Sequence, residues 1–411
     1  MEPALDLGIA TVNIALAAIL AGIFGVWVYF LAYMSKSFRL APRLESFDRR
    51  AGVGHPKVSV ILPARNEEKY IARCLDTLLA QDYPNFEVIA INDGSTDRTG
   101  EIIERYAKKD RRVVHVDTPP KPEGWAGKNW ACVQGYGAAT GDYLFFTDAD
   151  TEHEPTAISL AVGHMLAENL DALTAIPRLL CKDLWTRITL PGLSTFLHTR
   201  FSPLRVNDPD KKTGYFFGSF FVITRKTYEA VGTHVAVKEE LVEDGALGSR
   251  VKEAGHRMKM VRGEKYVDAV WARDLSTLWH GLRRLVIPLY HQDKRGAHLI
   301  AAAVFFILFA PFLFLAYSLP VLALADGGLS APTAVALMTV QMLTISALLL
   351  TTAVQSRFGV FQSPAYALGA PVGGALICLG FASAIVDARK KDAVRWRDRH
   401  YTVSEKQSFM R

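Results

Sequence analysis

Long apolar runs near both ends of the chain restrict its fold more than any other feature. Residues 8–34 form an unbroken apolar run, and about 20 such residues are enough to cross a bilayer. No basic segment precedes this run, and it is longer than the apolar part of a typical signal peptide. Three more runs, at 298–325, 331–354 and 365–388, lie toward the other end. We therefore expect an N-terminal membrane helix and two or three C-terminal spans.

Basic residues next to these runs indicate how the chain is oriented. Five Lys and Arg residues lie between 36 and 50, directly after the first run, and the positive-inside rule places such residues in the cytoplasm. The last run is followed by a basic tail at 389–411 that contains Trp396. Three full crossings would put this tail outside the cell. We therefore expect one run to be re-entrant or to lie in the membrane interface, with Trp396 as an anchor.

The charge and the cysteines exclude other classes of protein. The net charge of +6 is concentrated beside the apolar runs, which suits an anionic membrane surface. No basic stripe interleaved with aromatic residues falls on a nucleic-acid reader module, so no nucleic-acid partner is expected. The four cysteines have no CxxC pairing, which predicts free thiols in a reducing compartment rather than a disulfide framework or a zinc site.

The centre of the chain alternates strand-like and helix-like segments between residues 57 and 265. Short runs rich in Val, Ile and Phe, at 58–62, 86–91, 113–116 and 143–146, are typical of buried parallel strands. Amphipathic stretches at 67–81 and 99–109 lie between them, with Asp97 and Thr99 as candidate caps of the second. This order predicts an α/β domain with an open, doubly wound sheet, whose ligands bind beyond the carboxyl ends of the strands.

Two loops follow the first two predicted strands and carry polar groups suited to a nucleotide. Pro63, Arg65 and Glu67 lie in the loop 63–67, where backbone groups can hold a nucleoside and Glu67 can hydrogen-bond a ribose. Asp93 begins the segment Asp93-Gly94-Ser95-Thr96-Asp97, and its carboxylate can accept a hydrogen bond from the imide N–H of uracil or guanine. Each loop alone also fits an ordinary capped helix with an acidic first turn. Their occurrence on successive strands favours binding.

Two further acidic motifs complete the pattern. Asp148 and Asp150 directly follow the strand at 143–146, and two such carboxylates on an extended segment are costly to bury without a cation. Mg²⁺ and Mn²⁺ prefer oxygen ligands, so these residues are candidate ligands for a metal that neutralises a leaving diphosphate. Glu243 and Asp244 open a helix-like stretch, where a carboxylate can deprotonate an acceptor hydroxyl. Acidic residues in a first helical turn are also common for dipole reasons.

Taken together, the four motifs resemble those of family 2 glycosyltransferases with the GT-A fold. The resemblance covers about residues 57–265. It implies that Asp93 reads the base, that Asp148 and Asp150 form the donor and metal motif, and that Asp244 is the catalytic base of an inverting reaction. The segments at 122–132 and 205–209 resemble a membrane-bound branch associated with hopanoid or carotenoid glycosylation. In that comparison Lys128 corresponds to a lysine near the nucleotide, although a surface lysine before a helix would look the same.

The chain departs from the processive members of this family at one motif. Those members carry Gln-x-x-Arg-Trp near the first downstream membrane segment, whereas this chain has His280-Gly281-Leu282-Arg283-Arg284. A single transfer is therefore expected instead of polymer synthesis. Arg283 and Arg284 can still pair with a diphosphate or bind lipid head groups. The mixture of apolar and basic residues at 275–289 predicts a helix on the membrane surface.

These inferences define the expected organisation and function. We expect an N-terminal membrane helix at 1–35, a basic linker at 36–56, a GT-A domain with an interfacial helix at 57–290, a membrane region at 298–388 and a basic tail at 389–411. The expected protein is a multi-pass enzyme of the inner cell membrane with its catalytic domain in the cytoplasm. It would move a sugar from a UDP- or GDP-sugar to a lipid, with Mg²⁺ or Mn²⁺ as cofactor.

Other readings of the same residues remain open from the sequence. The lipid acceptor can be a polyprenyl phosphate, a hopanoid, a carotenoid or a glycerolipid. A metal-dependent nucleotidyl or phosphoryl transferase acting on a lipid would also use acidic residues in an α/β site. The absence of a GxxxxGK[ST] loop argues against kinases and ATPases. A transporter or scaffold is a third reading, but its spans would be expected to carry charges, and these runs are almost uncharged.

Overall fold

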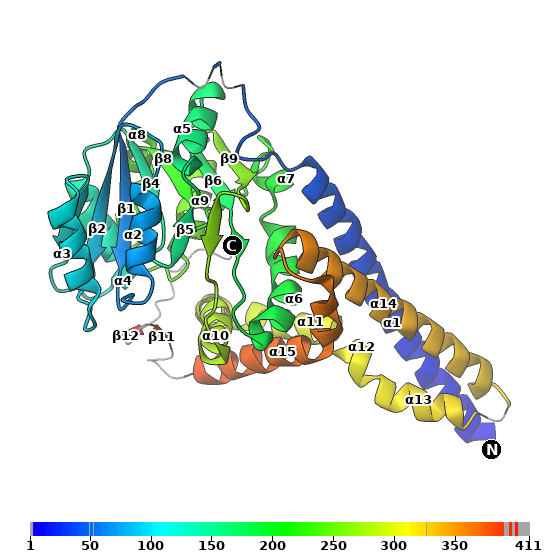
Figure 1. Cartoon of the computed structure of the whole chain (residues 1–411). Helices are drawn as coiled ribbons and strands as arrows, with labels where there is room; N and C mark the ends of the chain where they lie inside the picture. Colours follow the sequence, from blue (N-terminus) through cyan, green and yellow to red (C-terminus); the bar gives the residue numbers. More distant parts are fainter. Residues whose placement is uncertain are drawn as a thin grey trace. The chain divides into compact units, whose positions relative to one another are not determined.

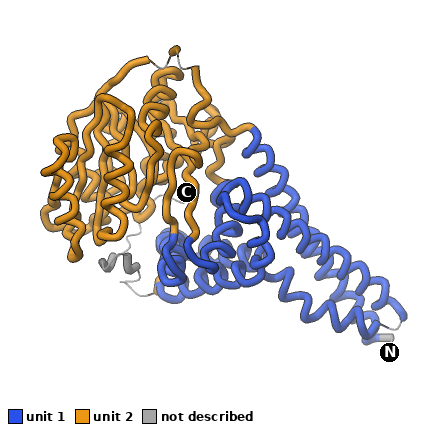
Figure 2. Tube along the Cα trace, viewed as in Figure 1, with its two compact units in different colours: residues 1–39, 182–199, 272–387 blue, residues 40–181, 200–271, 388–411 orange. Residues whose placement is uncertain are grey.

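The chain divides into two compact units, each assembled from separate segments of sequence (Figure 2). A computed structural model describes residues 3–48, 50–51, 53–325 and 327–389, and the backbone of two short strands at 394–396 and 399–401. The predicted basic tail, with Trp396, and Arg49 lie outside the residues whose side chains are described. The first unit comprises 1–39, 182–199 and 272–387, and the second comprises 40–181, 200–271 and 388–411.

The second unit is built on a seven-stranded sheet of order β3-β2-β1-β4-β8-β6-β9 (Figure 1). Its strands are β1 Val58–Ala64, β2 Phe86–Asn92, β3 Val113–Asp117, β4 Tyr143–Phe146, β6 Ala172–Ile176, β8 Phe221–Thr224 and β9 Met258–Arg262. The four strands predicted from the sequence are confirmed, and β1 to β4 are parallel. The sheet is nevertheless mixed, because β8 runs antiparallel to both β4 and β6.

Helices cover both faces of this sheet, as a doubly wound α/β fold requires. Alternate residues of β1 enter different cores. Val60 and Leu62 pack with α2 Ile71–Leu79, α3 Thr99–Lys109 and α5 Ala157–Ala167, whereas Ile61 packs with α4 Gly127–Ala138 and α9 Glu243–Glu253. Both faces are buried, which explains why the strands read as continuous apolar runs. The helices of this unit are α2 Ile71–Leu79, α3 Thr99–Lys109, α4 Gly127–Ala138, α5 Ala157–Ala167, α7 Pro203–Val206, α8 Arg225–Ala230, the 3₁₀ helix η1 His234–Val237 and α9 Glu243–Glu253.

Two details near the first loop differ from the sequence prediction. Helix α2 begins at Ile71 rather than at Glu67. Asn66 has a positive φ of 53°, and the backbone N–H of Glu67 donates to Thr99 Oγ1 at 2.8 Å instead of to a helical carbonyl. Arg98 is the N-cap of α3, while Asp97 Oδ1 accepts from the Thr99 N–H at 3.0 Å. A second, small sheet of β5 Thr151–His153, β10 Val267–Ala269 and β7 Arg178–Leu179 lies beside the main one.

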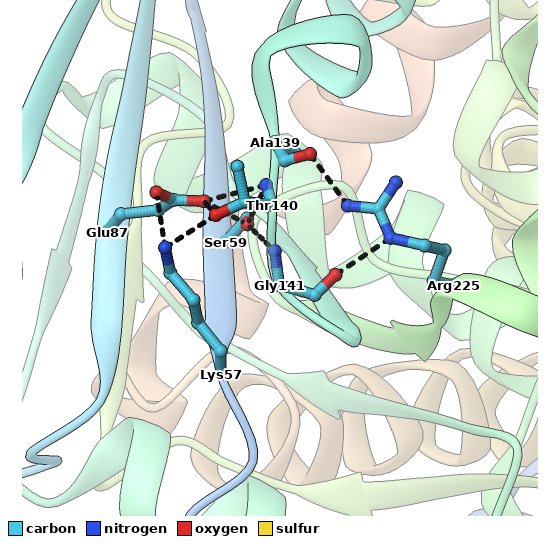
Figure 3. Close-up of polar contacts among 7 residues, drawn as sticks. All are labelled: Lys57, Ser59, Glu87, Ala139, Thr140, Gly141 and Arg225. Carbon is cyan, nitrogen blue, oxygen red and sulfur yellow. Dashed lines mark hydrogen bonds and ion pairs between the residues drawn. The ribbon is translucent and has the colours of Figure 1, made fainter.

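A polar network holds the turn between α4 and β4 at the amino ends of the strands (Figure 3). The carboxylate of Glu87 accepts from Ser59 Oγ at 2.6 Å and from the Thr140 backbone N–H at 2.8 Å, and it pairs with Lys57 Nζ at 3.0 Å. On the other side of the turn, the Arg225 guanidinium donates to the carbonyls of Gly141 and Ala139 at 2.9 and 2.8 Å. These contacts fix the start of β4 against β1 and β2.

Replacing Glu87 by alanine should destabilise this unit by about 2 kcal/mol, because Ser59, Thr140 and Lys57 lose a charged acceptor. Burial alone would raise the pKa of Glu87, but hydrogen bonds from Ser59, Thr140 and Lys57 outweigh it and lower the pKa. The carboxylate therefore stabilises the fold above the unfolded pKa of about 4.3, and this contribution is lost as the pH falls through the lower folded pKa.

Thermal unfolding of the purified chain at pH 7 and near pH 3 measures this contribution. The Glu87→Ala variant should unfold at a lower temperature than wild type at pH 7, and the difference should shrink near pH 3. Glu104→Ala is the matched control, because its ion pair with Lys108 is solvent-exposed and should contribute little. An equal loss in both variants, or a difference that does not depend on pH, would contradict the assignment.

The first unit is entirely helical in its described residues. Its helices are α1 Pro3–Leu40, α6 Leu184–Arg200, α10 Leu275–Gln292, α11 Lys294–Leu308, α12 Ala310–Leu313, α13 Leu315–Ala323, α14 Ser330–Phe358, the 3₁₀ helix η2 Pro364–Gly369 and α15 Ala370–Asp387. Three helical segments, 4–40, 330–358 and 364–387, are long and apolar enough to cross a membrane. A fourth candidate combines α11 with α12 and α13 and is bent by 51°. A bend of this kind is compatible with the expected re-entrant segment.

Buried polar side chains connect the helices of this unit. Thr344 on α14 donates to the carbonyl of Leu20 on α1 at 3.1 Å. Gln341 donates to the carbonyl of Pro311 at 2.8 Å, at the break between α11 and α12, and its Oε1 accepts from Ser318 at 2.6 Å. Such contacts are the usual polar links between helices in lipid.

Helix α6 belongs to this helical unit, although in sequence it lies between strands β7 and β8 of the α/β unit. His198 lies 3.0 Å from Ser37 Oγ of α1, and Gln355 of α14 donates to Ser194 Oγ at 2.9 Å. The alternation of strand-like and helix-like segments in the sequence did not indicate that this helix joins the helical unit. Helix α10, predicted to be interfacial, packs Leu278, Leu282 and Val286 within the unit, against α11 and α15. Its position on a membrane surface stays a prediction.

Candidate active site

The acidic motifs meet at one edge of the main sheet because β1, β2 and β4 are parallel and end there. The β1 loop carries Arg65 and Glu67, the β2 loop carries Asp93, and the turn after β4 carries Asp148. Strand β8 runs antiparallel to β4, so its amino end lies at this same edge. Gly218 and Ser219, which precede β8 in the chain, therefore reach the edge. The ligand edge expected of an open α/β sheet is thus formed by all four of these strands.

Lys128 lies at the centre of the carboxylates. Its Nζ is 2.7 Å from Asp148 Oδ1 and 2.7 Å from Glu243 Oε1. Asp244, the next residue, accepts the backbone N–H of Gly218 through Oδ2 at 2.8 Å. Glu243 is 6% exposed, whereas about a third of the Lys128 and Asp148 side chains remains accessible. The Lys128 ammonium therefore pairs with one carboxylate of the predicted metal motif and with one of the predicted catalytic pair.

The electrostatics of this cluster suit proton transfer. Burial would lower the pKa of Lys128, but the charges of Asp148, Glu243 and Asp244 outweigh it and raise the pKa well above the usual value, so the ammonium stays charged. Burial and the nearby Glu243 charge raise the pKa of Asp244 to about 6. A carboxylate with a pKa near the working pH is a better general base than an ordinary aspartate.

Gly218 was missed by the sequence analysis and lies in the middle of the site. A Cβ atom at this position would be 2.9 Å from Asp244 Oδ2, 2.9 Å from Lys128 Nζ and 3.5 Å from Asp148 Oδ2. The functional groups can approach each other this closely only because residue 218 has no side chain. The available signal was a glycine three residues before the buried strand β8, since close backbone approach is a known use of glycine.

The nucleoside-binding candidates form a second group at the ends of β1 and β2. Arg65 Nη1 donates to the carbonyls of Asp93 and Gly94 at 2.5 and 2.8 Å, which joins the two loops. Asp93 is 4% exposed, and its Oδ1 accepts from Thr118 Oγ1 at 3.1 Å. Glu67 is also buried. Arg65 thus shapes the loop through backbone contacts, and the contacts of Glu67 and Asp93 with a ribose and a base stay predictions.

Asp148 and Asp150 have the chemistry of a metal site that a substrate completes. Both are partly exposed in the turn that follows β4. Among the residues that the structure describes, no three His, Cys, Asp or Glu side chains lie together as a full set of ligands. Mg²⁺ and similar ions are commonly held by one or two carboxylates together with substrate phosphates and water. The residues present therefore fit a divalent ion that binds with a diphosphate.

The segment at 122–132 forms the start of α4 and delivers Lys128. Asn129 is fully buried and donates to the carbonyls of Val237 and Glu240 at 2.6 and 3.0 Å. Trp130 Nε1 donates to the carbonyl of Pro119 at 3.0 Å. These contacts fix the first turn of α4 against the loop that leads to Glu243. Lys128 and Glu243 also line a small cavity together with Pro63, Phe146 and His234.

The remaining residues singled out in the sequence make contacts with other partners. Arg283 and Arg284 belong to the helical unit, where Arg283 Nη2 pairs with Asp387 Oδ2 at 2.8 Å. Their contact with a diphosphate stays a prediction. In the segment at 205–209, the Asn207 amide donates to the Met260 carbonyl at 2.9 Å and accepts from the Met260 N–H at 2.7 Å. That contact extends the edge strand β9, which is a structural role.

Comparison with known proteins identifies the α/β unit. Residues 59–232 match the family model described as glycosyl transferase family 2. This region is a family 2 glycosyltransferase domain. It contains the predicted nucleotide loops, Lys128, Asp148 and Gly218, whereas Glu243 and Asp244 follow its end.

Curated relatives resemble this glycosyltransferase domain over part of their length. Glycosyltransferase GlyA of Streptococcus pneumoniae is 36% identical over 94 residues, which are 23% of this chain and 13% of the relative. The 4,4'-diaponeurosporenoate glycosyltransferase of Staphylococcus aureus is 30% identical over 204 residues, 47% of this chain and 51% of the relative. The alignments thus span about half of one relative and a much smaller part of the other.

A solved structure shares the fold of the glycosyltransferase domain and its flanking helices. The mannosyltransferase PcManGT from Pyrobaculum calidifontis, determined with GDP-Man and Mn²⁺, has a TM-score of 0.50 and is 20% identical. The match covers 89% of this chain and 99% of that one. It confirms the predicted GT-A type of α/β fold.

Proposed function

We propose that this chain is an inverting glycosyltransferase that moves a sugar from a UDP- or GDP-sugar to a membrane lipid. The proposal rests mainly on the arrangement around Gly218, where Asp244, Lys128 and Asp148 converge from α9, α4 and the turn after β4. A base, a cation and a candidate metal ligand within a few ångströms are what a displacement at an anomeric carbon requires. The family 2 domain at 59–232 supports the same reaction class.

Asp244 is the proposed general base. It takes the proton from the acceptor's hydroxyl or carboxyl group as that oxygen attacks the anomeric carbon. The bond between this carbon and the diphosphate oxygen breaks on the opposite face, so the configuration inverts. The electron pair leaves with the nucleoside diphosphate, and Lys128, held by Glu243, offers its positive charge to the departing phosphates. Glu243 then acts by orienting Lys128.

Asp148 and Asp150 would hold Mg²⁺ or Mn²⁺ together with the donor diphosphate. When bound, the ion supplies Lewis-acid stabilisation of the leaving group. Asp93, at the end of β2, would accept from the imide N–H of the base, which is present in both uracil and guanine. The structure of the mannosyltransferase with GDP-Man and Mn²⁺ supports a donor and a cofactor of this kind.

The acceptor is proposed to be a lipid because apolar helices make up most of the other unit. The name of the Staphylococcus aureus relative favours a carotenoid among the acceptors considered, which also include hopanoids, polyprenyl phosphates and glycerolipids.

The enzyme would lie in the inner cell membrane with its catalytic unit in the cytoplasm, where nucleotide sugars are available. A cysteine placed at exposed Lys108 should resist impermeant reagents in intact cells. Labelling before lysis would reverse this orientation.

Calorimetry of UDP and GDP binding tests the donor site directly. Wild-type protein should bind one of these nucleotides more tightly with Mn²⁺ than with EDTA. Asp150→Ala should weaken the Mn²⁺-dependent part roughly ten- to hundredfold, because one of two protein ligands is lost. Asp142→Ala is the control, since Asp142 is an exposed aspartate at the far end of β4. Unchanged affinity in Asp150→Ala would make that residue structural.

A further inference from the structure

A buried histidine lies behind the turn that carries the two candidate metal ligands. His153, on β5, is 4% exposed, and its Nε2 is 3.0 Å from Thr147 Oγ1 and 3.0 Å from Thr151 Oγ1. Its ring packs edge-on against Phe145, with centroids 5.5 Å apart. Thr147 and Thr151 stand immediately on either side of the segment Asp148-Ala149-Asp150.

The two threonines hold the backbone on both sides of the site. Thr151 Oγ1 donates to the carbonyl of Asp148 at 2.7 Å. Thr147 Oγ1 donates to the carbonyl of Ser219 at 2.8 Å. Ser219 follows Gly218, whose N–H is held by Asp244. The His153 imidazole thus contacts two hydroxyls. One fixes the turn that carries Asp148 and Asp150, and the other holds the segment between Gly218 and strand β8, next to Asp244.

The surroundings of the ring indicate which nitrogen carries its hydrogen. Nε2 faces the Thr147 and Thr151 hydroxyls, which lie 2.9 Å from each other and each lie within hydrogen-bond distance of a carbonyl. Both hydroxyl oxygens can accept a hydrogen from Nε2. His153 Nδ1 is buried and has no hydrogen-bond partner among the residues that the structure describes, and a hydrogen there would be an unsatisfied buried donor. The ring is therefore neutral with its hydrogen on Nε2.

We infer that His153 is a positioning residue for the donor site: its Nε2–H orders Thr147 and Thr151, and these set the Asp148-Ala149-Asp150 turn for a metal-bound diphosphate. The inference rests on the proposed function. Groups behind metal ligands typically change metal affinity by roughly ten- to hundredfold when they are removed. His153 would act in this way without touching the donor.

A pair of amide substitutions tests the position of the donated hydrogen. Glutamine can place an N–H near the position of Nε2, whereas the shorter asparagine reaches only the position of Nδ1. His153→Asn should therefore raise the Mn²⁺ concentration for half-maximal UDP or GDP binding roughly tenfold or more. His153→Gln should remain within about threefold of wild type, a margin well below that range.

Two further variants keep the test independent of folding. Thr151→Val removes the contact to the Asp148 carbonyl without changing the imidazole, and it should reproduce the loss of Mn²⁺ affinity. His164→Asn is the control, because His164 is equally buried but contacts Leu44 and Glu168 instead of the site. It should leave the Mn²⁺ dependence unchanged even if it lowers thermal stability.

Three results would overturn the inference. Equal Mn²⁺ affinity in wild type, His153→Asn and Thr151→Val would show that the cluster does not position the turn. Equal losses in His153→Gln and His153→Asn, or a similar loss in His164→Asn, would indicate a general packing effect. Wild-type protein that binds neither nucleotide with Mn²⁺ would reject the proposed function itself, and the inference with it.

Discussion

Asp244→Asn should lower the turnover number for sugar transfer by about 10²–10⁴-fold, the usual contribution of a general base. The affinity for the nucleotide should stay close to that of wild type. Asparagine keeps the shape of the side chain, and its carbonyl oxygen can still accept the Gly218 N–H that Asp244 accepts at 2.8 Å. What is lost is the ability to take a proton from the acceptor.

The pH dependence of wild-type turnover gives a second view of the same residue. The pKa of Asp244 is raised to about 6, first by burial and then by Glu243. Since the deprotonated form is the active one, kcat/KM for transfer should fall as the pH drops below about 6 and level off above it. The pH profile of kcat/KM, measured between about pH 5 and 8, reports this pKa because it follows the essential groups of the free enzyme.

Glu243→Gln is the informative comparison for Asp244→Asn. Glutamine keeps one oxygen near Lys128 Nζ, which lies 2.7 Å from the Glu243 carboxylate, but removes its charge. We expect a weaker effect, expressed mainly in donor affinity. If Asp244→Asn retained near-normal turnover, or if Glu243→Gln were the more damaging change, the base would have to be assigned to another residue.

Gly218→Ala should reduce transfer by about 10²-fold while leaving the fold nearly as stable as wild type. The new methyl group would lie 2.9 Å from both Asp244 Oδ2 and Lys128 Nζ. These atoms are at the ends of side chains and can move aside at little cost to the fold. Displacing reacting groups by about 1 Å is nevertheless enough for a loss of this size.

Gly137→Ala is the matched control for this substitution. Gly137 lies in α4 in the same unit, and a Cβ there would meet no atom within 4 Å. Alanine in a helix should slightly raise stability and leave transfer unchanged. The measurements are the thermal unfolding temperature and the rate of transfer for both variants. Wild-type activity in Gly218→Ala would mean that Lys128, Asp148 and Asp244 do not need their close approach.

The fold of the α/β unit could be predicted from the sequence because β1, β2 and β4 are mostly buried on both faces. Val60 and Ile61 enter different cores, so the strand appears as an uninterrupted apolar run. The carboxyl ends of parallel strands share one edge, so the convergence of Asp93 with Asp148 follows from strand order alone.

Other parts of the site depend on contacts that leave no periodic pattern. Strand β8 runs antiparallel to its neighbours, and only this direction brings Gly218 to the ligand edge. The importance of Gly218 comes from a missing side chain, and that of His153 from two buried contacts, with Thr147 and Thr151. Neither has a signature in hydropathy. The sequence likewise does not indicate that α6 belongs to the helical unit, because this depends on its contacts with the distant helices α1 and α14.

Transfer of a labelled sugar to lipid tests the central claim most directly. Purified protein in lipid vesicles would be incubated with Mn²⁺ and UDP- or GDP-sugars labelled in the sugar, and in parallel with donors labelled in the nucleoside. Our account predicts that sugar label enters the organic phase, that nucleoside label remains in water as the diphosphate, and that Asp244→Asn and EDTA each abolish the transfer. Nucleoside label in the lipid would indicate a nucleotidyl transferase and would contradict the account.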